Sequence, residues 1–262
     1  MTMRVLVIAA GTIASLRELA AADDADDRAA TALEVTNPLP YVETLKFEPM
    51  YTFSHDDTRY RAELRFQPVL PFAGFLVPGL DVQGVWSIAR AQLTAESLQT
   101  SDGTTSGFEN LNLVDVAAFR VDTLTLGAGF GTVFPMATSS ELGPAKWQLG
   151  PAAGFHYAPV HAFSIAALAQ ALWSVAGSSQ VADQSYVTLQ PFVALHVGHG
   201  FHVSSDAQMS FYWRGGSTTI PVNLGAGYAF SKHFDASVKA TRTVAGHDDG
   251  MWKGELDLSF LP

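Results

Sequence analysis

The feature that most restricts the fold of this chain is an alternation of polarity with a period of two residues. In KWQLGPAAGFHY (residues 146–157), large apolar or aromatic side chains alternate with small, amide and basic ones. Because successive side chains of a β-strand point to opposite faces, this pattern predicts a strand with one apolar face and one small, polar face. RYRAELRFQPVL (59–70), FHVSSDAQMSFYW (201–213) and WKGELDLSF (252–260) show the same two-faced pattern.

Twelve segments of this kind follow residue 43, and turn residues separate them. Most are about ten residues or longer, as a tilted strand crossing a bilayer must be, whereas strands of soluble proteins average about five or six residues. The expected strands are residues 44–54, 59–71, 84–97, 108–119, 122–134, 146–158, 162–176, 185–198, 200–213, 217–230, 233–244 and 251–261.

Alternation alone also fits a soluble β-sandwich, in which the apolar face points to a core. Two further features favour a membrane barrel. Aromatic residues recur near strand ends, and longer polar connections such as SLQTSDGTTSG (97–107) alternate with tight turns such as GHG (198–200). The long apolar connection LPFAGFLVPGLD (70–81) departs from this scheme, and FSIAALAQALWSVAG (163–177) would also suit an amphipathic helix.

A strand set of this kind must close on itself if it lies in lipid. Inside a bilayer every backbone N–H and C=O group needs a partner, and an open sheet edge supplies none. The predicted fold class is therefore all-β: a closed antiparallel transmembrane β-barrel of about 12 strands.

The N-terminus has the pattern of a secretory signal. Arg4 precedes an apolar run at residues 5–16, and three alanines at 20–22 provide a cleavage site. The run is too short to span a bilayer, and the alternative interpretation is a short helix of a cytosolic domain. We expect a signal peptide at 1–22, a periplasmic N-terminal segment at 23–43 that is a candidate plug, and the outer-membrane β-barrel at 44–262.

The charge content suits a protein that faces both lipid and water. Charged residues make up 15% of the chain, against about 25% in an ordinary soluble protein, and the formal net charge is −10. Nucleic-acid binding requires a basic face, so this acidic balance excludes nucleic acid as a partner. The chain contains no cysteine, which excludes disulfides, thiolate metal sites and cysteine nucleophiles.

Several short motifs in order resemble one family of barrels. They are GTVFPMATSSELGPAKWQLGPAAGFHY (131–157), FQPVLPF (66–72), VPGLDVQGVWSIAR (77–90), WSVAG (173–177), LQPFV (189–193) and IPVNLGAGYAF (220–230). Together they resemble the outer-membrane β-barrel family named for the meta-pathway of phenol degradation, over about residues 40–262. The resemblance implies a small barrel that acts as a transporter for aromatic or hydrophobic compounds, and it supplies no catalytic residues.

The polar faces of the strands identify the candidate site. In a closed barrel the last strand pairs with the first, which brings the charged faces of 251–261, 44–54 and 59–71 together. This wall of mixed charge either orients a solute or forms a structural network of ion pairs, and both interpretations remain open. Gly127, Gly129 and Gly131 are expected to leave room on the opposite wall. The predicted lumen-lining residues are Lys46, Glu48, Arg61, Glu63, Arg65, Gln67, Asp206, Lys239, Lys253, Glu255 and Asp257.

Two histidines are candidates for metal binding or for catalysis. With GHG (198–200) as a turn, His196 and His202 become cross-strand neighbours, but no third metal ligand is identifiable, which favours a polar pair at the rim. His202, Ser204 and Asp206 resemble the His-x-Ser strand motif of outer-membrane phospholipases. These side chains face inward, however, whereas a lipid-cleaving site must open toward lipid.

We expect a passive channel or transporter in the bacterial outer membrane for small hydrophobic or aromatic solutes, as the resemblance implies. The alternatives are a structural or surface-interaction barrel without transport and, third, a membrane-embedded lipid hydrolase. We predict no enzymatic activity, catalytic residue, metal or cofactor. The expected partners are the lipid bilayer, a small-molecule solute, lipopolysaccharide and, during biogenesis, the barrel-assembly machinery.

Overall fold

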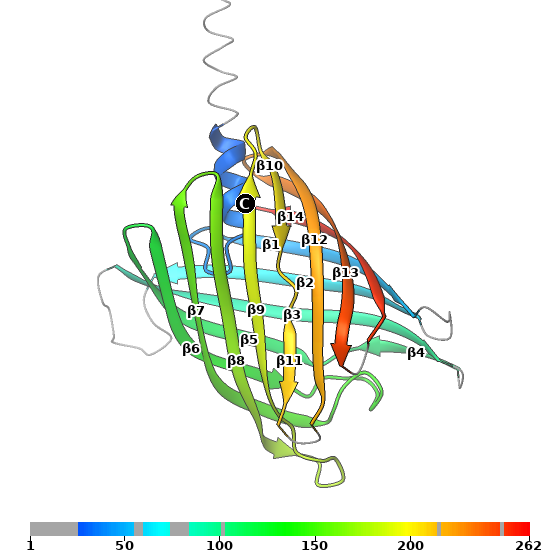
Figure 1. Cartoon of the computed structure of the whole chain (residues 1–262). Helices are drawn as coiled ribbons and strands as arrows, with labels where there is room; N and C mark the ends of the chain where they lie inside the picture. The colour runs from blue at the N-terminus through cyan, green and yellow to red at the C-terminus, as the bar shows by residue number, and fades with distance from the viewer. Residues whose placement is uncertain (1–25, 55–59, 74–83, 101–102, 214–215, 247–248) are drawn as a thin grey trace, which may run out of the picture.

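The structure, a computed structural model, describes residues 26–54, 60–73, 84–100, 103–213, 216–246 and 249–262 (Figure 1). The predicted signal peptide and most of the apolar connection 70–81 lie outside these residues. Among the described residues, no helix has the length and apolar character required to cross a membrane.

The described chain contains one helix, at residues 26–35, followed by fourteen strands. The strands are β1 (Thr44–Phe53), β2 (Tyr60–Ala73), β3 (Val85–Thr100), β4 (Gly103–Phe108), β5 (Leu111–Val121), β6 (Leu124–Phe134), β7 (Lys146–Val160), β8 (Phe163–Gly177), β9 (Ser185–His196), β10 (Phe201–Ser205), β11 (Met209–Tyr212), β12 (Thr218–Ser231), β13 (Phe234–Gly246) and β14 (Trp252–Phe260).

These strands form a closed antiparallel barrel, as the sequence predicted. Neighbours pair around the whole circumference, and β14 pairs with β1, with Leu45 opposite Phe260. The fourteen strands fill twelve positions in the wall, because β4 and β5 share one position beside β3, and β10 and β11 share one position between β9 and β12. The segment 163–177, for which a helix was the alternative, is the strand β8.

Two predicted strands are each interrupted where an asparagine side chain bonds the backbone. Between β10 and β11, the Asn223 side chain accepts a hydrogen bond from the Asp206 backbone N–H at 2.8 Å and donates one to the Asp206 carboxylate at 2.7 Å. Between β4 and β5, Asn110 bonds the backbone of Ala137 at 2.9 Å and of Pro144 at 2.8 Å. The sequence prediction of unbroken strands at 200–213 and 108–119 was therefore wrong in these details.

The outer face of the barrel is apolar between two aromatic bands. We call the end that carries the helix and the C-terminus the helix end, and the opposite end the loop end (Figure 1). Leu64 and Leu224, which point outward, are 52% and 66% exposed. Aromatic rings meet in the pairs Trp173–Trp213 and Phe134–Trp147 near the loop end, and Phe47–Phe260 and Phe234–Phe260 near the helix end. This is the surface that a bilayer contacts.

Leu224→Arg is expected to destabilise the barrel by about 2–4 kcal/mol in lipid, because Leu224 lies near the middle of β12 and faces outward. Val160→Arg, at the end of β7, should cost only about 0–1 kcal/mol, because a charge near the interface reaches water. Unfolding in urea from lipid vesicles, followed by tryptophan fluorescence, measures both values. Equal losses at the two positions would contradict the assignment of the hydrocarbon layer.

Inside the barrel, the N-terminal segment packs against one wall. Leu39 has no exposed surface and belongs to a cluster with side chains of β2, β3, β5 and β7. Residues 31 and 32 and residues 37–40 are also buried, whereas residues 26, 27 and 30 are exposed. The other members of the cluster are Val69, Trp86, Ile88, Val114, Val116, Ala118 and Ala152.

Candidate functional site

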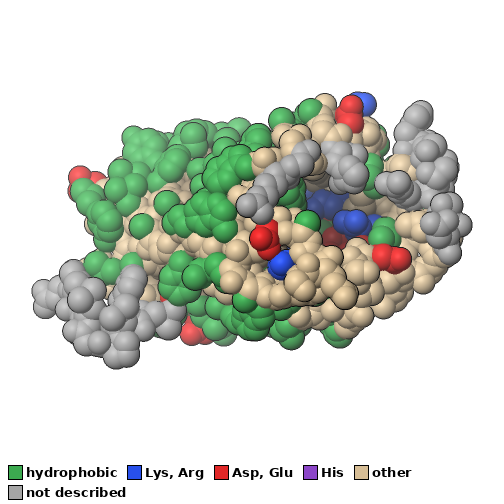
Figure 2. Space-filling model, turned by 90° about the horizontal axis from the view of Figure 1, so that it is seen from below, with side chains coloured by type: hydrophobic (Ala, Val, Ile, Leu, Met, Phe, Trp, Pro, Cys, Tyr) green, Lys and Arg blue, Asp and Glu red, His purple; other side chains and the backbone are tan. Residues whose placement is uncertain are grey.

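A cavity of about 480 Å³ lies inside the barrel. Its wall includes inward-facing residues of β1, β2, β13 and β14, and residues 34–38 with Pro40 line it toward the helix end. Figure 2 looks into the loop end and shows a hollow with Lys and Arg side chains within it. The cavity therefore extends from the N-terminal segment toward the loop end.

All eleven residues that the sequence predicted for the lumen, from Lys46 to Asp257, line this cavity. Strand geometry explains why, because residues of one parity share one face. On β2, for example, Arg61, Glu63, Arg65 and Gln67 alternate with outward residues such as Leu64. Six basic and seven acidic side chains line the cavity in total, so its charges nearly balance.

Ion pairs connect the first strands of the charged wall. Arg65 Nη1 lies 3.3 Å from Glu48 Oε2, and Arg61 Nε lies 2.8 Å from Glu96 Oε1. Beside them, Gln92 donates a hydrogen bond to the Gln67 side-chain oxygen at 2.6 Å. These contacts leave the two arginines neutralised within the wall.

Lys239, on β13, is the centre of the ion-pair network on the other side of the β1–β14 pairing. Its Nζ lies 2.7 Å from Asp206 Oδ2, 2.6 Å from Asp257 Oδ2 and 3.3 Å from Glu255 Oε1. Lys253 is a second partner of Glu255, at 3.2 Å. The sequence placed these residues on one wall, but it did not reveal that a single buried amine joins three carboxylates from two strand positions.

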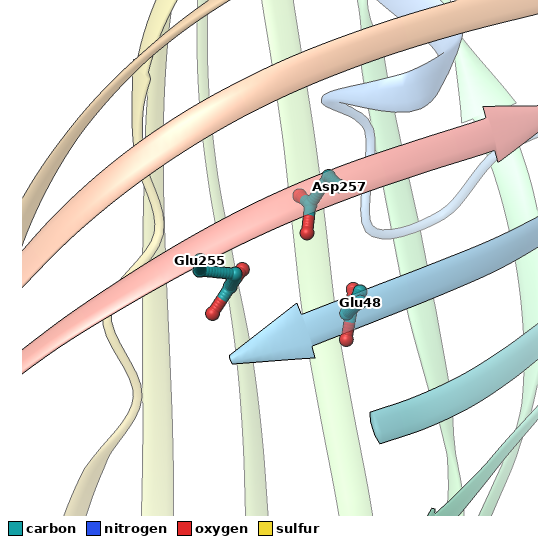
Figure 3. Close-up of side chains that lie close together, drawn as sticks. All are labelled: Glu48, Glu255 and Asp257. Atoms are coloured by element: carbon teal, nitrogen blue, oxygen red, sulfur yellow. The ribbon is translucent and has the colours of Figure 1, made fainter. Parts of the chain in front are cut away.

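Glu48, Glu255 and Asp257 come close together at the junction of β1 and β14 (Figure 3). One carboxylate oxygen from each lies within 4.8 Å of the others. Three carboxylates at this spacing repel one another unless cations are near. Arg65 and Lys239 supply that charge, so the cluster is part of the ion-pair network.

Specific contacts hold the N-terminal segment in the lumen. Lys46 Nζ donates a hydrogen bond to the Val35 carbonyl oxygen at 2.8 Å. His196 Nε2 lies 3.2 Å from the Ala32 carbonyl oxygen and 3.3 Å from the Thr36 hydroxyl. Lys46, predicted to line the lumen, therefore also fixes the segment.

Burial raises the pKa of Glu34, because removal from water disfavours its charged form. The carboxylate accepts a hydrogen bond from the Tyr41 backbone N–H at 3.2 Å, and this contact opposes the effect. Tyr41 in turn packs edge to face on Trp86 with ring centres 5.2 Å apart. These contacts tie the end of the segment to β3.

The expectation that glycines leave room on the opposite wall was wrong. A Cβ atom at Gly127 would lie 3.2 Å from a methyl carbon of Leu39, and one at Gly131 would collide with the Gln170 side chain. The space beside these two glycines is therefore filled from within the chain. The cavity runs along the charged wall instead.

His196 and His202 are cross-strand partners, as predicted, with ring centres 6.2 Å apart. His202 Nδ1 faces Asp235 at 3.6 Å, and Asp206 bonds Lys239 instead. Among the described residues, Ser204 makes no hydrogen bond with His202, which a serine nucleophile and its base require. This arrangement gives no support to a lipid hydrolase.

Comparison with known proteins supports the architecture. An outer membrane channel from Pseudomonas putida F1 is similar with a TM-score of 0.65 and 14% identity, over 87% of this chain and 98% of that one. This chain has the fold of an outer-membrane β-barrel. The NanC porin is similar with a TM-score of 0.58 and 11% identity, over 83% of this chain and 100% of the porin chain.

No family model and no curated protein matches the chain. The resemblance to the phenol meta-pathway family therefore remains a prediction from the motifs. The fold itself is one that bacterial outer membranes contain, which agrees with the predicted localisation.

Proposed function

We propose that the barrel is a passive channel for small solutes. The observation that carries this proposal is the 480 Å³ cavity along the charged wall, which is lined by all eleven predicted residues. A barrel of about eight strands is filled by its own side chains and one of sixteen holds a water channel, so twelve strands suit a narrow path. Similarity to a solved outer membrane channel and a porin supports the same conclusion.

The proposed solute is small and has an aromatic or other apolar body. The motif resemblance supports this, and so does the cavity, because Val69, Leu98 and Phe192 line it together with the charged groups. We further propose that residues 26–43 plug the helix end and that residues 1–22 are removed as a signal peptide. The outward apolar band fits lipid and lipopolysaccharide, and the alternating strand β14 fits recognition by the barrel-assembly machinery.

Reconstitution tests the proposal directly. The barrel in planar bilayers should give discrete current steps in KCl, and proteoliposomes should swell in small aromatic alcohols faster than protein-free liposomes. Heat-unfolded protein is the control. The proposal fails if neither the full chain nor a variant without residues 26–40 conducts ions or admits solutes, a result that would favour the surface-interaction barrel.

A further inference from the structure

Arg90 is a buried guanidinium in the lumen whose bonding capacity is largely unused. It lies near the middle of β3, lines the cavity and is 6% exposed. Its Nη1 donates to the Gln190 side-chain oxygen at 3.3 Å. Its Nε and Nη2 atoms are buried and have no hydrogen-bond partner within the described part of the chain.

The surroundings of Arg90 do not neutralise it by contact. The other two cavity arginines, Arg61 and Arg65, each form an ion pair, while Arg90 forms none with any described residue. Glu48 and Asp206, two acids of the same cavity, are bonded to Arg65 and Lys239. A buried charge without partners is costly, so an oxyanion supplied from outside would be bound strongly here.

The unused atoms have a defined geometry. Nε and Nη2 form one edge of the planar guanidinium, and their N–H groups point the same way. This edge matches the two oxygens of a carboxylate, which it binds through two parallel hydrogen bonds. A carboxylate is therefore a ligand that this side chain fits.

The position of Arg90 places its guanidinium in the path of a solute. Arg90 belongs to β3 and Gln190 to β9, and four strand positions, β5 to β8, separate them along the wall (Figure 1). Their 3.3 Å contact thus spans the lumen. Val69, opposite Arg90 in the register of β2 and β3, and Phe192, two residues after Gln190, also line the cavity and offer apolar surface beside the charge.

We propose that Arg90 binds the carboxylate of the transported solute, so that the channel prefers small aromatic or aliphatic carboxylates. The guanidinium leaves the Gln190 oxygen, which exposes its buried Nε and Nη2 edge, and the carboxylate pairs with this edge while the apolar body of the solute lies against Val69 and Phe192. This inference rests on the proposed channel function, of which it names the substrate class.

Benzoate is the probe, with benzyl alcohol as its uncharged counterpart. Titration calorimetry on the folded barrel in detergent should show benzoate binding and no comparable binding of benzyl alcohol. In planar bilayers, benzoate should interrupt the KCl current in a concentration-dependent manner. Arg90→Gln should weaken benzoate at least about tenfold in both measurements, because a charged, paired contact is lost.

Three variants complete the test. Arg90→Lys keeps the positive charge but lacks the two parallel N–H donors. Its affinity for benzoate should therefore lie between those of Arg90→Gln and the wild type. Gln190→Ala removes the oxygen that holds the guanidinium through Nη1 and should strengthen benzoate binding, and it tests the site even if Arg90→Gln folds poorly. Arg242→Gln changes an exposed arginine that lies over the Trp252 ring, outside the cavity lining, so it should leave benzoate binding unchanged.

Equal benzoate affinity in the wild type and Arg90→Gln would overturn the inference, as would equal binding of benzyl alcohol. Failure of the channel proposal has a different signature, because a barrel that does not conduct still reports benzoate binding by calorimetry. A conducting barrel in which benzoate neither binds nor blocks refutes the carboxylate site alone.

Discussion

Deletion of residues 26–40 is expected to raise the single-channel conductance of the barrel several-fold. The buried part of this segment lies inside the lumen, where Leu39 fills space beside Gly127 and the Lys46 amine bonds Val35. The wall does not depend on it, since β1 closes the barrel through its own pairing with β14. Current steps in planar bilayers, recorded for both proteins in the same KCl solution, measure the change.

A shorter deletion provides the matched control. Residues 26–30 form the more exposed part of the helix, so their removal should leave the conductance close to that of the full chain. Leu39→Ala, which keeps the length of the segment but weakens its packing, should give an intermediate conductance with frequent openings. Unchanged conductance after deletion of 26–40 would show that the segment does not obstruct the path.

The wall of this lumen could be predicted from sequence because strand periodicity alone decides it. Once Leu64 is assigned to the lipid side, Arg61, Glu63 and Arg65 must face inward, whatever the number of strands. Closure by pairing of the last strand with the first then places Lys253 and Glu255 next to the first strand. Local pattern and one topological rule were sufficient for these residues.

Contacts across the lumen could not be predicted in the same way. Arg90 contacts Gln190, a hundred residues away, only because strand number, tilt and stagger place the two residues at the same height along the barrel axis. The same holds for Leu39, whose position opposite Gly127 depends on how the N-terminal segment enters the barrel. Glycines in the wall indicate spare volume, but the pattern does not tell whether solvent or another part of the chain occupies it.

Lys239→Met is expected to destabilise the folded barrel by about 3–5 kcal/mol, the largest loss that we expect from a single lumen substitution. The Lys239 side chain is 6% exposed and its amine neutralises Asp206, Glu255 and Asp257. Methionine fills a similar volume but leaves these carboxylates facing one another without their shared cation. Urea unfolding in detergent micelles, followed by tryptophan fluorescence, measures the change in the free energy of unfolding.

Lys253→Met is the matched control, because the Lys253 side chain is 27% exposed and its ion pair is with Glu255. Partial hydration of this amine should limit the loss to about 1 kcal/mol or less. Adding Asp257→Asn to Lys239→Met removes one of the carboxylate charges that has lost its cation and should recover part of the stability. Asp257→Asn alone should not stabilise the wild type. Equal losses for the two lysine variants, or no recovery in the double variant, would contradict a wall held together by Lys239. The charged side chains of the lumen would then contribute to solute binding and not to the stability of the wall.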